Sequence, residues 1–292
     1  MDLRSAVSRI DYYTQGLLET AKYSDAGREI TWVIVESDDD CEVYGKFMYD
    51  DDNVKLRDSG CKEADKIGKY VIRKGWARVE RLVAEYKDSL TIIGIRDKDY
   101  TAFVDTRDVT PGVFVTDCRD LEMMMIQTGI LQRIITSPIR GRDFSDILSS
   151  VYEHTRVLGY MRIMNEVCAL SCKFHDFLKM SLLWNQTTHS YLSNWKDALT
   201  SCFLKYSEKE VTALQFDDFV TKNNLDVLSV YDVCRGHDVV NHLAWNLIEN
   251  KYSQKNLTEM MKEEYSLEDF QRTALYAELQ KWEQRNCRRV VK

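Results

Sequence analysis

Short uncharged runs of β-branched and other apolar residues constrain the fold of this chain more than any other feature of its sequence. They occupy residues 30–35 (ITWVIV), 91–95 (TIIGI) and 113–116 (VFVT), and a weaker run occupies 54–57 (VKLR). Strands without charge are typical of a parallel sheet covered by helices on both faces. Helical patterns separate the runs, and the order β-α-β-α-β-β-α predicts an α/β fold with a mainly parallel sheet flanked by helices.

Composition favours one large domain or two smaller, helix-rich ones. The chain has 292 residues, 44% of them hydrophobic, with only 2 prolines and 12 glycines, which disfavours disordered, collagen-like and many-turned all-β proteins. From residue 144 onward the pattern is almost wholly helical. We expect an α/β domain with an N-terminal helix over residues 1–140. A helical accessory region over 141–292 should follow and return to the site of the first domain near 230–240.

Local capping patterns indicate where individual helices begin. A helix is expected over residues 41–48, with Asp38 and Asp39 available as N-terminal caps. Residues 62–87 have a helical pattern with Gly75 as a candidate break. Capping boxes are expected at Ser207-x-x-Glu210 and Ser266-x-x-Asp269.

Charge and cysteine usage exclude several classes of protein. The 40 basic and 47 acidic residues give a formal net charge of −7, so any nucleic-acid contact must be local rather than a polybasic wrapping surface. No apolar run approaches the roughly 20 residues that span a bilayer. The N-terminus has no apolar signal-peptide core, and none of the 8 cysteines forms a Cys-x-x-Cys pair. We therefore expect reduced thiols and a cytoplasmic protein.

Acidic residues follow three of the four predicted strands. Glu36 ends the first, Asp97 and Asp99 follow the third, and Asp117 follows the fourth, with Asp120 and Glu122 close behind. The carboxyl ends of parallel strands lie along one edge of a sheet, so these side chains should converge. Clustered carboxylates suit magnesium or manganese. The alternative, solvated acidic loops, is preferred only for residues 50–52.

These motifs resemble the TOPRIM metal-dependent catalytic fold, whose signature is a Glu after one strand and an Asp-x-Asp after a later one. VIVESDDD around Glu36 and IGIRDKDY around Asp97 match it. The spacing from Glu36 to Asp40 is similar to that of OLD nucleases, and residues 30–125 together with CRGHDVV near Arg235 resemble TOPRIM-type effectors of PARIS anti-phage systems. Ser37 replaces the glycine usual in topoisomerases and primases, which argues against those enzymes.

The resemblance implies roles for the acidic residues. Asp97 and Asp99 would bind magnesium or manganese, and Glu36 would be either a ligand or the general base. Asp40 would complete the site or position a water, and Asp117 is a further candidate ligand. Residues expected to orient these ligands are Asp120 and Glu122. Metal ions held in this way activate water and neutralise developing charge in phosphodiester hydrolysis.

Cationic groups that could contact a phosphate occur in two places. Arg235 and His237 flank a glycine, and the alternative for this segment is an ordinary helix start capped by Asp238. Residues 62–87 carry eight basic against four acidic residues, and a solvated helix surface explains them as well as a phosphate-tracking stripe does. The candidate nucleic-acid contacts there are Lys62, Lys66, Lys69, Arg73, Lys74, Arg78 and Arg81.

The expected function is that of a magnesium-dependent TOPRIM nuclease. The resemblance implies a toxic anti-phage effector that cleaves transfer RNA, is held in check by an ABC-type ATPase partner and forms a homodimer when active. The chain contains no Gly-x-x-x-x-Gly-Lys-Ser/Thr motif, so ATP hydrolysis would belong to that partner. Two alternatives stay open: an OLD-like DNA nuclease and a catalytically inactive TOPRIM module that acts as a regulatory subunit.

Overall fold

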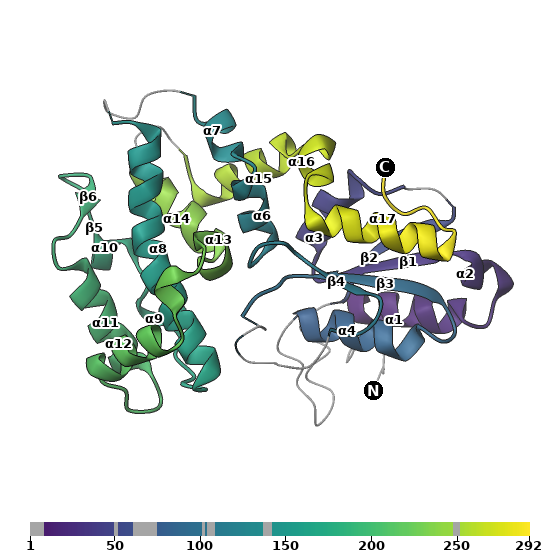
Figure 1. The fold of residues 1–292 in the computed structure, drawn as a ribbon, viewed down its shortest axis with the longest axis horizontal. Coiled ribbons are helices and arrows are strands. Elements are labelled where there is room, and N and C mark those ends of the chain that lie inside the picture. Colours follow the sequence, from purple (N-terminus) through teal and green to yellow (C-terminus); the bar gives the residue numbers. More distant parts are fainter. Residues whose placement is uncertain are drawn as a thin grey trace. The chain divides into compact units, whose positions relative to one another are not determined.

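The computed structural model divides the chain into two compact units (Figure 1). The first, here called the sheet unit, comprises Met1–Lys98, Arg107–Asp117 and Tyr265–Lys292. The second, the helical unit, comprises Asp99–Thr106 and Cys118–Glu264. The structure describes residues 9–49, 52–60, 75–100, 103, 109–136, 142–247 and 252–292.

The sheet unit is built on a four-stranded, wholly parallel sheet with strand order β2-β1-β3-β4. Every residue of the central strand β1 is buried, as its uncharged sequence predicts for a strand covered on both faces. The predicted α/β fold with a parallel sheet flanked by helices is therefore confirmed. The strands are β1 (Thr31–Val35), β2 (Val54–Asp58), β3 (Thr91–Arg96) and β4 (Val113–Val115).

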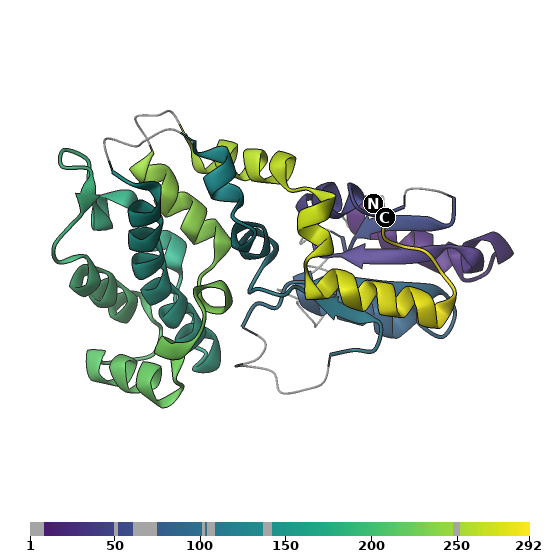
Figure 2. The same cartoon turned by 45° about the horizontal axis from the view of Figure 1, so that its top comes forward.

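Helices cover both faces of this sheet (Figures 1 and 2). α1 (Arg9–Ala21) and α4 (Gly75–Tyr86) pack on one face, where Leu18 and Leu82 are buried against Trp32 of β1. α17 (Ala274–Asn286) lies on the other face. Burying apolar side chains on both sides of the strands is what holds this three-layer arrangement together.

The C-terminal segment belongs to the sheet unit, which differs from the expected division at residue 140. Phe270 of α16 (Leu267–Gln271) stacks on Phe47 with ring centroids 5.0 Å apart and meets Tyr44 edge-on at 5.8 Å. A β-bridge also joins Met48 to Val291. These contacts span more than two hundred residues of sequence, which local patterns do not encode.

The beginning of α3 (Asp38–Gly45) also differs from expectation. Its N-cap is Ser37 rather than Asp38 or Asp39, and the Ser37 side chain accepts a hydrogen bond from the backbone of Asp40. The Asp40 carboxylate accepts from the backbone of Ser37 in return, which completes a capping box. The capping box expected at Ser266 and Asp269 is present. Residues 207–210 form no such cap, because they lie in the connection after α11. A further short helix described in the sheet unit is α2 (Asp25–Glu29).

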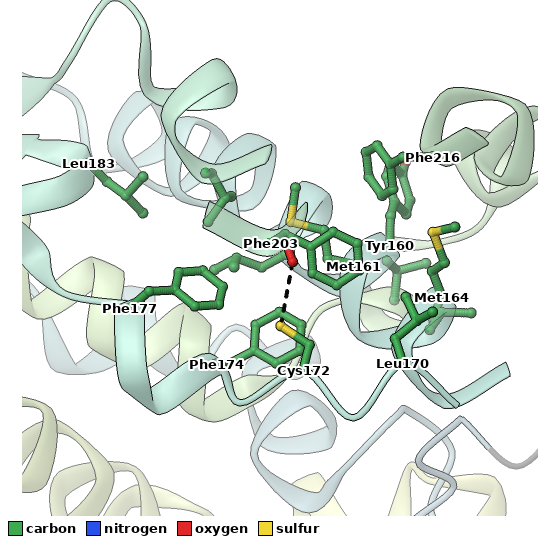
Figure 3. Packing of buried hydrophobic residues seen from close by; sticks show 14 of the residues in the cluster. Tyr160, Met161, Met164, Leu170, Cys172, Phe174, Phe177, Leu183, Phe203 and Phe216 are labelled. Carbon is green, nitrogen blue, oxygen red and sulfur yellow. Dashed lines mark hydrogen bonds between the residues drawn. The ribbon is translucent and has the colours of Figure 1, made fainter. Parts of the chain in front are cut away.

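An apolar core of the helical unit is shown in Figure 3. Leu158, Met161 and Phe203 are completely buried in it. Within the described residues, no helix is both long and apolar enough to cross a membrane. The elements are α6 (Leu121–Gln127), α7 (Ile130–Ile134), α8 (Phe144–Val167), α9 (Phe174–Phe177), α10 (Met180–Leu183), β5 (Trp184–Asn185), β6 (Ser190–Tyr191), α11 (Trp195–Tyr206), α12 (Ala213–Lys222), η3 (Leu225–Val227), α13 (Val230–Val233), α14 (Gly236–Asn246) and α15 (Gln254–Glu264).

Candidate functional site

Glu36 and Asp97 meet at the carboxyl edge of the sheet. Glu36 directly follows β1 and Asp97 directly follows β3, the neighbouring strand. The backbone N–H of Asp97 donates a hydrogen bond of 2.8 Å to Oε1 of Glu36. The parallel register therefore brings together two residues that lie 61 positions apart in the sequence.

Hydrogen bonds on several sides hold the backbone that carries Asp97. The buried Arg96 donates to the carbonyl of Asp97 at 2.8 Å, and its guanidinium also pairs with Glu80 at 2.8 Å. The next residue, Lys98, donates its N–H to the hydroxyl of Thr116 at 2.9 Å. These contacts fix the start of the Asp-x-Asp motif. Arg96 is a supporting residue that the sequence did not reveal, because strand residues are ordinarily judged by their apolar character.

Asp40 lies on the first turn of α3 and is engaged by the capping box. One carboxylate oxygen accepts from both the N–H and the hydroxyl of Ser37, at 2.9 and 2.8 Å. Burial raises the pKa of the Asp40 carboxyl to about 6, and the hydrogen bonds from Ser37 offset only part of that effect. The pKa of this carboxyl is thus closer to neutral pH than that of an ordinary aspartate.

The phenol of Tyr44 interacts electrostatically with the acidic residues Asp40, Asp97 and Glu36. Burial raises the pKa of Tyr44 most, and the charges of Asp40, Asp97 and Glu36 raise it further. Its hydroxyl is buried and has no hydrogen-bond partner among the residues that the structure describes. Tyr44 was not predicted as a site residue, although its position four residues after Asp40 places both on one face of α3. The charges of three carboxylates thus act on one buried hydroxyl at this edge of the sheet unit.

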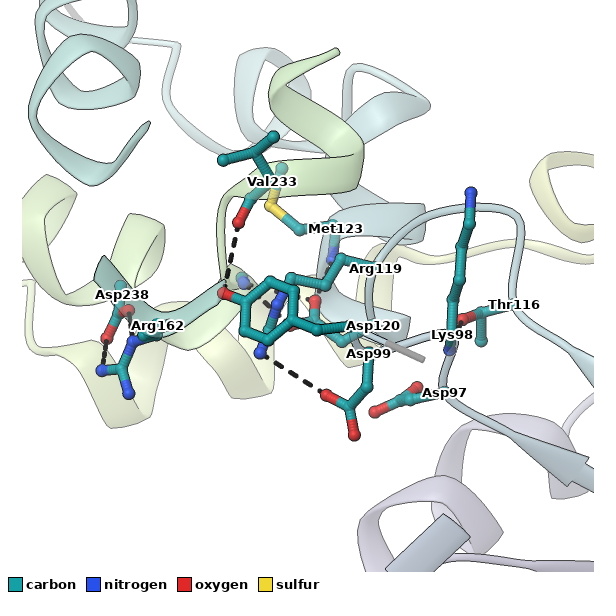
Figure 4. A network of polar contacts seen from close by, with 12 residues as sticks. Asp97, Lys98, Asp99, Thr116, Arg119, Asp120, Met123, Arg162, Val233 and Asp238 are labelled. Carbon is teal, nitrogen blue, oxygen red and sulfur yellow. Dashed lines mark hydrogen bonds and ion pairs between the residues drawn. The ribbon is translucent and has the colours of Figure 1, made fainter. Parts of the chain in front are cut away.

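In the helical unit, Arg119 holds the second aspartate of the motif (Figure 4). Asp99 has a left-handed backbone with φ of 47°, which aspartate tolerates better than most residues. Its N–H donates to the carbonyl of Arg119 at 2.7 Å, and its carboxylate pairs with the Arg119 guanidinium at 3.4 Å. Burial alone would lower the pKa of Arg119, but the charges of Tyr100, Asp120 and Asp99 reverse this effect, so the pKa is raised.

Asp120 connects α6 to α14 within the helical unit. Its carboxylate caps α6 through the N–H of Met123 at 2.9 Å, accepts the N–H of Gly236 at 3.1 Å and pairs with Arg119 at 2.7 Å. A Cβ on Gly236 would lie 2.4 Å from the Cβ of Glu122, so only glycine allows α14 to begin this close to α6. The sequence predicted that the backbone of Gly236 would bind a phosphate. In the structure its N–H group binds the Asp120 carboxylate instead.

Arg235 and His237 are exposed at the start of α14, where the phosphate-contacting groups were expected. Burial lowers the pKa of His237, and the charge of Arg235 lowers it further. Asp238 is not the cap of this helix, because Arg162 of α8 binds its carboxylate through two hydrogen bonds of 2.8 and 3.0 Å. This ion pair is shown in Figure 4. The predicted helix start and the surface position of His237 are therefore confirmed, whereas the predicted cap at Asp238 is wrong, because Arg235 is the N-cap.

Asp117 is bound at the start of a helix. Its two carboxylate oxygens accept the backbone N–H groups of Ala274 and Leu275 at 2.6 and 2.8 Å, at the first turn of α17. This contact attaches the C-terminal helix to the end of β4. The sequence predicted Asp117 as a candidate metal ligand. In the structure its carboxylate binds the backbone of Ala274, 157 residues away.

The expected basic stripe is described only in part. Arg78 is buried and donates to the carbonyl of Ser59, so it supports the end of β2 rather than facing solvent. Arg81 is exposed on α4, as expected. The rest of the stripe, Lys62, Lys66, Lys69, Arg73 and Lys74, lies outside the described residues.

Glu36 and Asp97 offer carboxylate oxygens, which is the ligand chemistry that magnesium and manganese prefer. Among the described residues, no three His, Cys, Asp or Glu side chains are arranged closely enough to hold a metal ion as they stand. Glu36 and Asp97 fit such an ion in donor type, and the buried hydroxyl of Tyr44 adds a polar group beside them.

Comparisons with known proteins leave the family of this chain open. No protein-family model matches the sequence, and no curated protein matches it.

Proposed function

We propose that this chain is a magnesium-dependent TOPRIM-type nuclease that acts as the toxic effector of an anti-phage system. The observation that supports this most is the hydrogen bond from the Asp97 N–H to the Glu36 carboxylate, at the edge where parallel sheets bind ligands. The sequence motifs around both residues resemble those of AriB, the effector of the PARIS system. An ABC-type ATPase partner, transfer RNA as substrate and an active homodimer rest on that resemblance alone.

The chemistry assigned to the site is phosphodiester hydrolysis. A bound divalent cation would neutralise charge on the phosphate and lower the pKa of an attacking water. Glu36 and Asp97 of the sheet unit are the residues that would hold it. The metal-binding role of Asp99, which belongs to the helical unit, rests on the sequence resemblance alone. Asp40, whose pKa is raised to about 6, is a carboxyl suited to accept or return a proton near neutral pH. A phosphate contact by Arg235 and His237, which are exposed in the helical unit, rests on the sequence resemblance alone.

A cleavage assay with matched variants tests the proposal. The purified chain, free of any partner, is incubated with total transfer RNA and with supercoiled plasmid, in magnesium and in EDTA. We expect magnesium-dependent nicks in transfer RNA and intact plasmid. Glu36→Gln and Asp97→Asn should each lower cleavage at least about 100-fold, since each removes a charge that a cation needs. Glu85→Gln, an exposed glutamate of α4, is the control and should retain activity.

Other outcomes separate the alternatives. Cleavage of plasmid with sparing of RNA would identify a DNA nuclease. Absence of cleavage on both substrates, with no magnesium binding by calorimetry, would indicate an inactive module with a regulatory role. Cleavage that persists in both Glu36→Gln and Asp97→Asn would refute the assigned site.

A further inference from the structure

We propose that Gly75, the first residue of α4, is a positioning residue for Glu36. Its missing side chain lets α4 lie directly against the Glu36 carboxylate and so fixes the orientation of that group. The proposal rests on the proposed function, because it assumes that the position of Glu36 matters for catalysis. From the sequence alone, Gly75 is only a candidate break in a helix.

The close approach of Gly75 to Glu36 is the observation that carries this inference. A Cβ built on Gly75 would lie 2.5 Å from Oε2 of Glu36 and 3.1 Å from its Cβ. Real Cβ atoms essentially never come within 3.0 Å of another heavy atom. Any residue other than glycine would therefore occupy space that the glutamate side chain now fills.

The two carboxylate oxygens of Glu36 are constrained from different directions. Oε1 accepts the N–H of Asp97 at 2.8 Å, while Oε2 lies against Gly75. A carboxylate held between a hydrogen-bond donor and a helix backbone has few alternative rotamers. The side chain is thus oriented before any ligand binds, which is the condition for efficient positioning.

Within α4, helix propensity alone would not select glycine at position 75. Alanine is otherwise preferred over glycine within helices. At position 75, helix propensity favours alanine, whereas the space that Glu36 occupies allows only glycine.

Substitution of Gly75 should therefore separate activity from stability. The atom nearest to the new methyl group is the flexible end of Glu36, so the glutamate should rotate away while the helix stays in place. This rotation breaks the hydrogen bond from Asp97 and misplaces the carboxylate by about 1 Å or more. A displacement of that size is enough to lower a catalytic rate about 100-fold.

Gly16→Ala provides the matched control for Gly75→Ala. Gly16 also lies in a helix of the sheet unit, α1, and a Cβ there would meet nothing within 4 Å. We expect Gly16→Ala to keep full activity and an equal or higher Tm. Gly75→Ala should keep a cooperative thermal transition and lower cleavage 10- to 100-fold, with a higher magnesium concentration needed for half-maximal rate. Full activity of Gly75→Ala, equal to that of Gly16→Ala, would overturn the inference.

A double-mutant cycle tests the contact without relying on activity. Gly75→Ala is measured for Tm in the wild-type background and in a Glu36→Ala background, which removes the 2.5 Å contact with Oε2 and keeps only the Cβ at 3.1 Å. We expect Gly75→Ala to lower Tm less, or to raise it more, in the Glu36→Ala background than in the wild type. Gly16→Ala should change Tm equally in both backgrounds. An equal effect of Gly75→Ala in both backgrounds would refute the contact. A wild-type chain that shows the coupling but cleaves nothing would refute the proposed function and leave the contact standing.

Discussion

Arg119 offers the most quantitative test of the helical unit. Its guanidinium and the Asp120 carboxylate are each only 6% exposed and lie 2.7 Å apart, and Asp99 pairs with the same guanidinium at 3.4 Å. The cation also lies 4.1 Å from the centre of the Tyr100 ring. The perturbation is Arg119→Met, which keeps the length of the side chain and removes the charge.

The expected loss of stability follows from what remains after the substitution. Asp120 would be a buried carboxylate without its cation, and breaking a buried pair in this way costs about 3–5 kcal/mol. Asp120 keeps its hydrogen bonds from the N–H groups of Met123 and Gly236, so the lower end of that range applies. About 3 kcal/mol corresponds to a fall in Tm of roughly 6–12 °C for a unit of this size.

The assay is urea unfolding followed by circular dichroism, together with thermal melting. Arg133→Met is the control, because Arg133 forms an ion pair with Glu264 at 3.2 Å that is largely exposed and worth at most about 1 kcal/mol. Adding Asp120→Asn to Arg119→Met should recover part of the loss, since the uncompensated charge is then gone. A loss for Arg119→Met no larger than that of Arg133→Met would refute the reasoning.

Three further predictions concern other contacts. Asp117→Ala should lower the free energy of unfolding by about 1–2 kcal/mol, because two N–H groups of α17 lose their acceptor, and urea titration against Asp88→Ala, an exposed control, measures it. Gly236→Ala should cost about 1–3 kcal/mol, since its Cβ would meet the Cβ of Glu122 and the backbone of α6, and an unchanged Tm would contradict this. Burial lowers the pKa of His242 to about 3, against about 6.5 when unfolded, so the unfolded chain takes up the proton first. Stability should therefore fall as pH drops from about 6.5 towards 3, by up to about 1.4 kcal/mol per pH unit, and His242→Gln should flatten this slope in urea titrations at pH 7.5 and 5.5.

Local sequence patterns were sufficient to predict the strands. The uncharged runs at 30–35 and 91–95 became β1 and β3, because a strand buried on both faces must be apolar throughout. The meeting of Glu36 and Asp97 followed from the same patterns, since parallel strands end on one side of a sheet. Both results depend only on the type of each element and the direction of its neighbours.

Contacts across long stretches of chain could not be predicted in this way. The attachment of α17 by Asp117, the return of Phe270 onto Phe47 and the ion pair of Arg162 with Asp238 each join elements whose sequences carry no mark of one another. Capping of α3 was misjudged for a related reason. Several polar residues in a row could each serve as a cap, and the backbone geometry selects one of them.

The sequence by itself determined which elements form and which carboxylates end the strands, because apolar periodicity and residue type act over a few neighbouring positions. Only the tertiary structure decided how those carboxylates are held. Gly75 lies against Glu36, and Tyr44 lies in the field of Glu36 and Asp97, because packing of α3 and α4 on the sheet brings them there. Close packing leaves room for some side chains and excludes others, and that property belongs to the folded arrangement rather than to any segment of the chain.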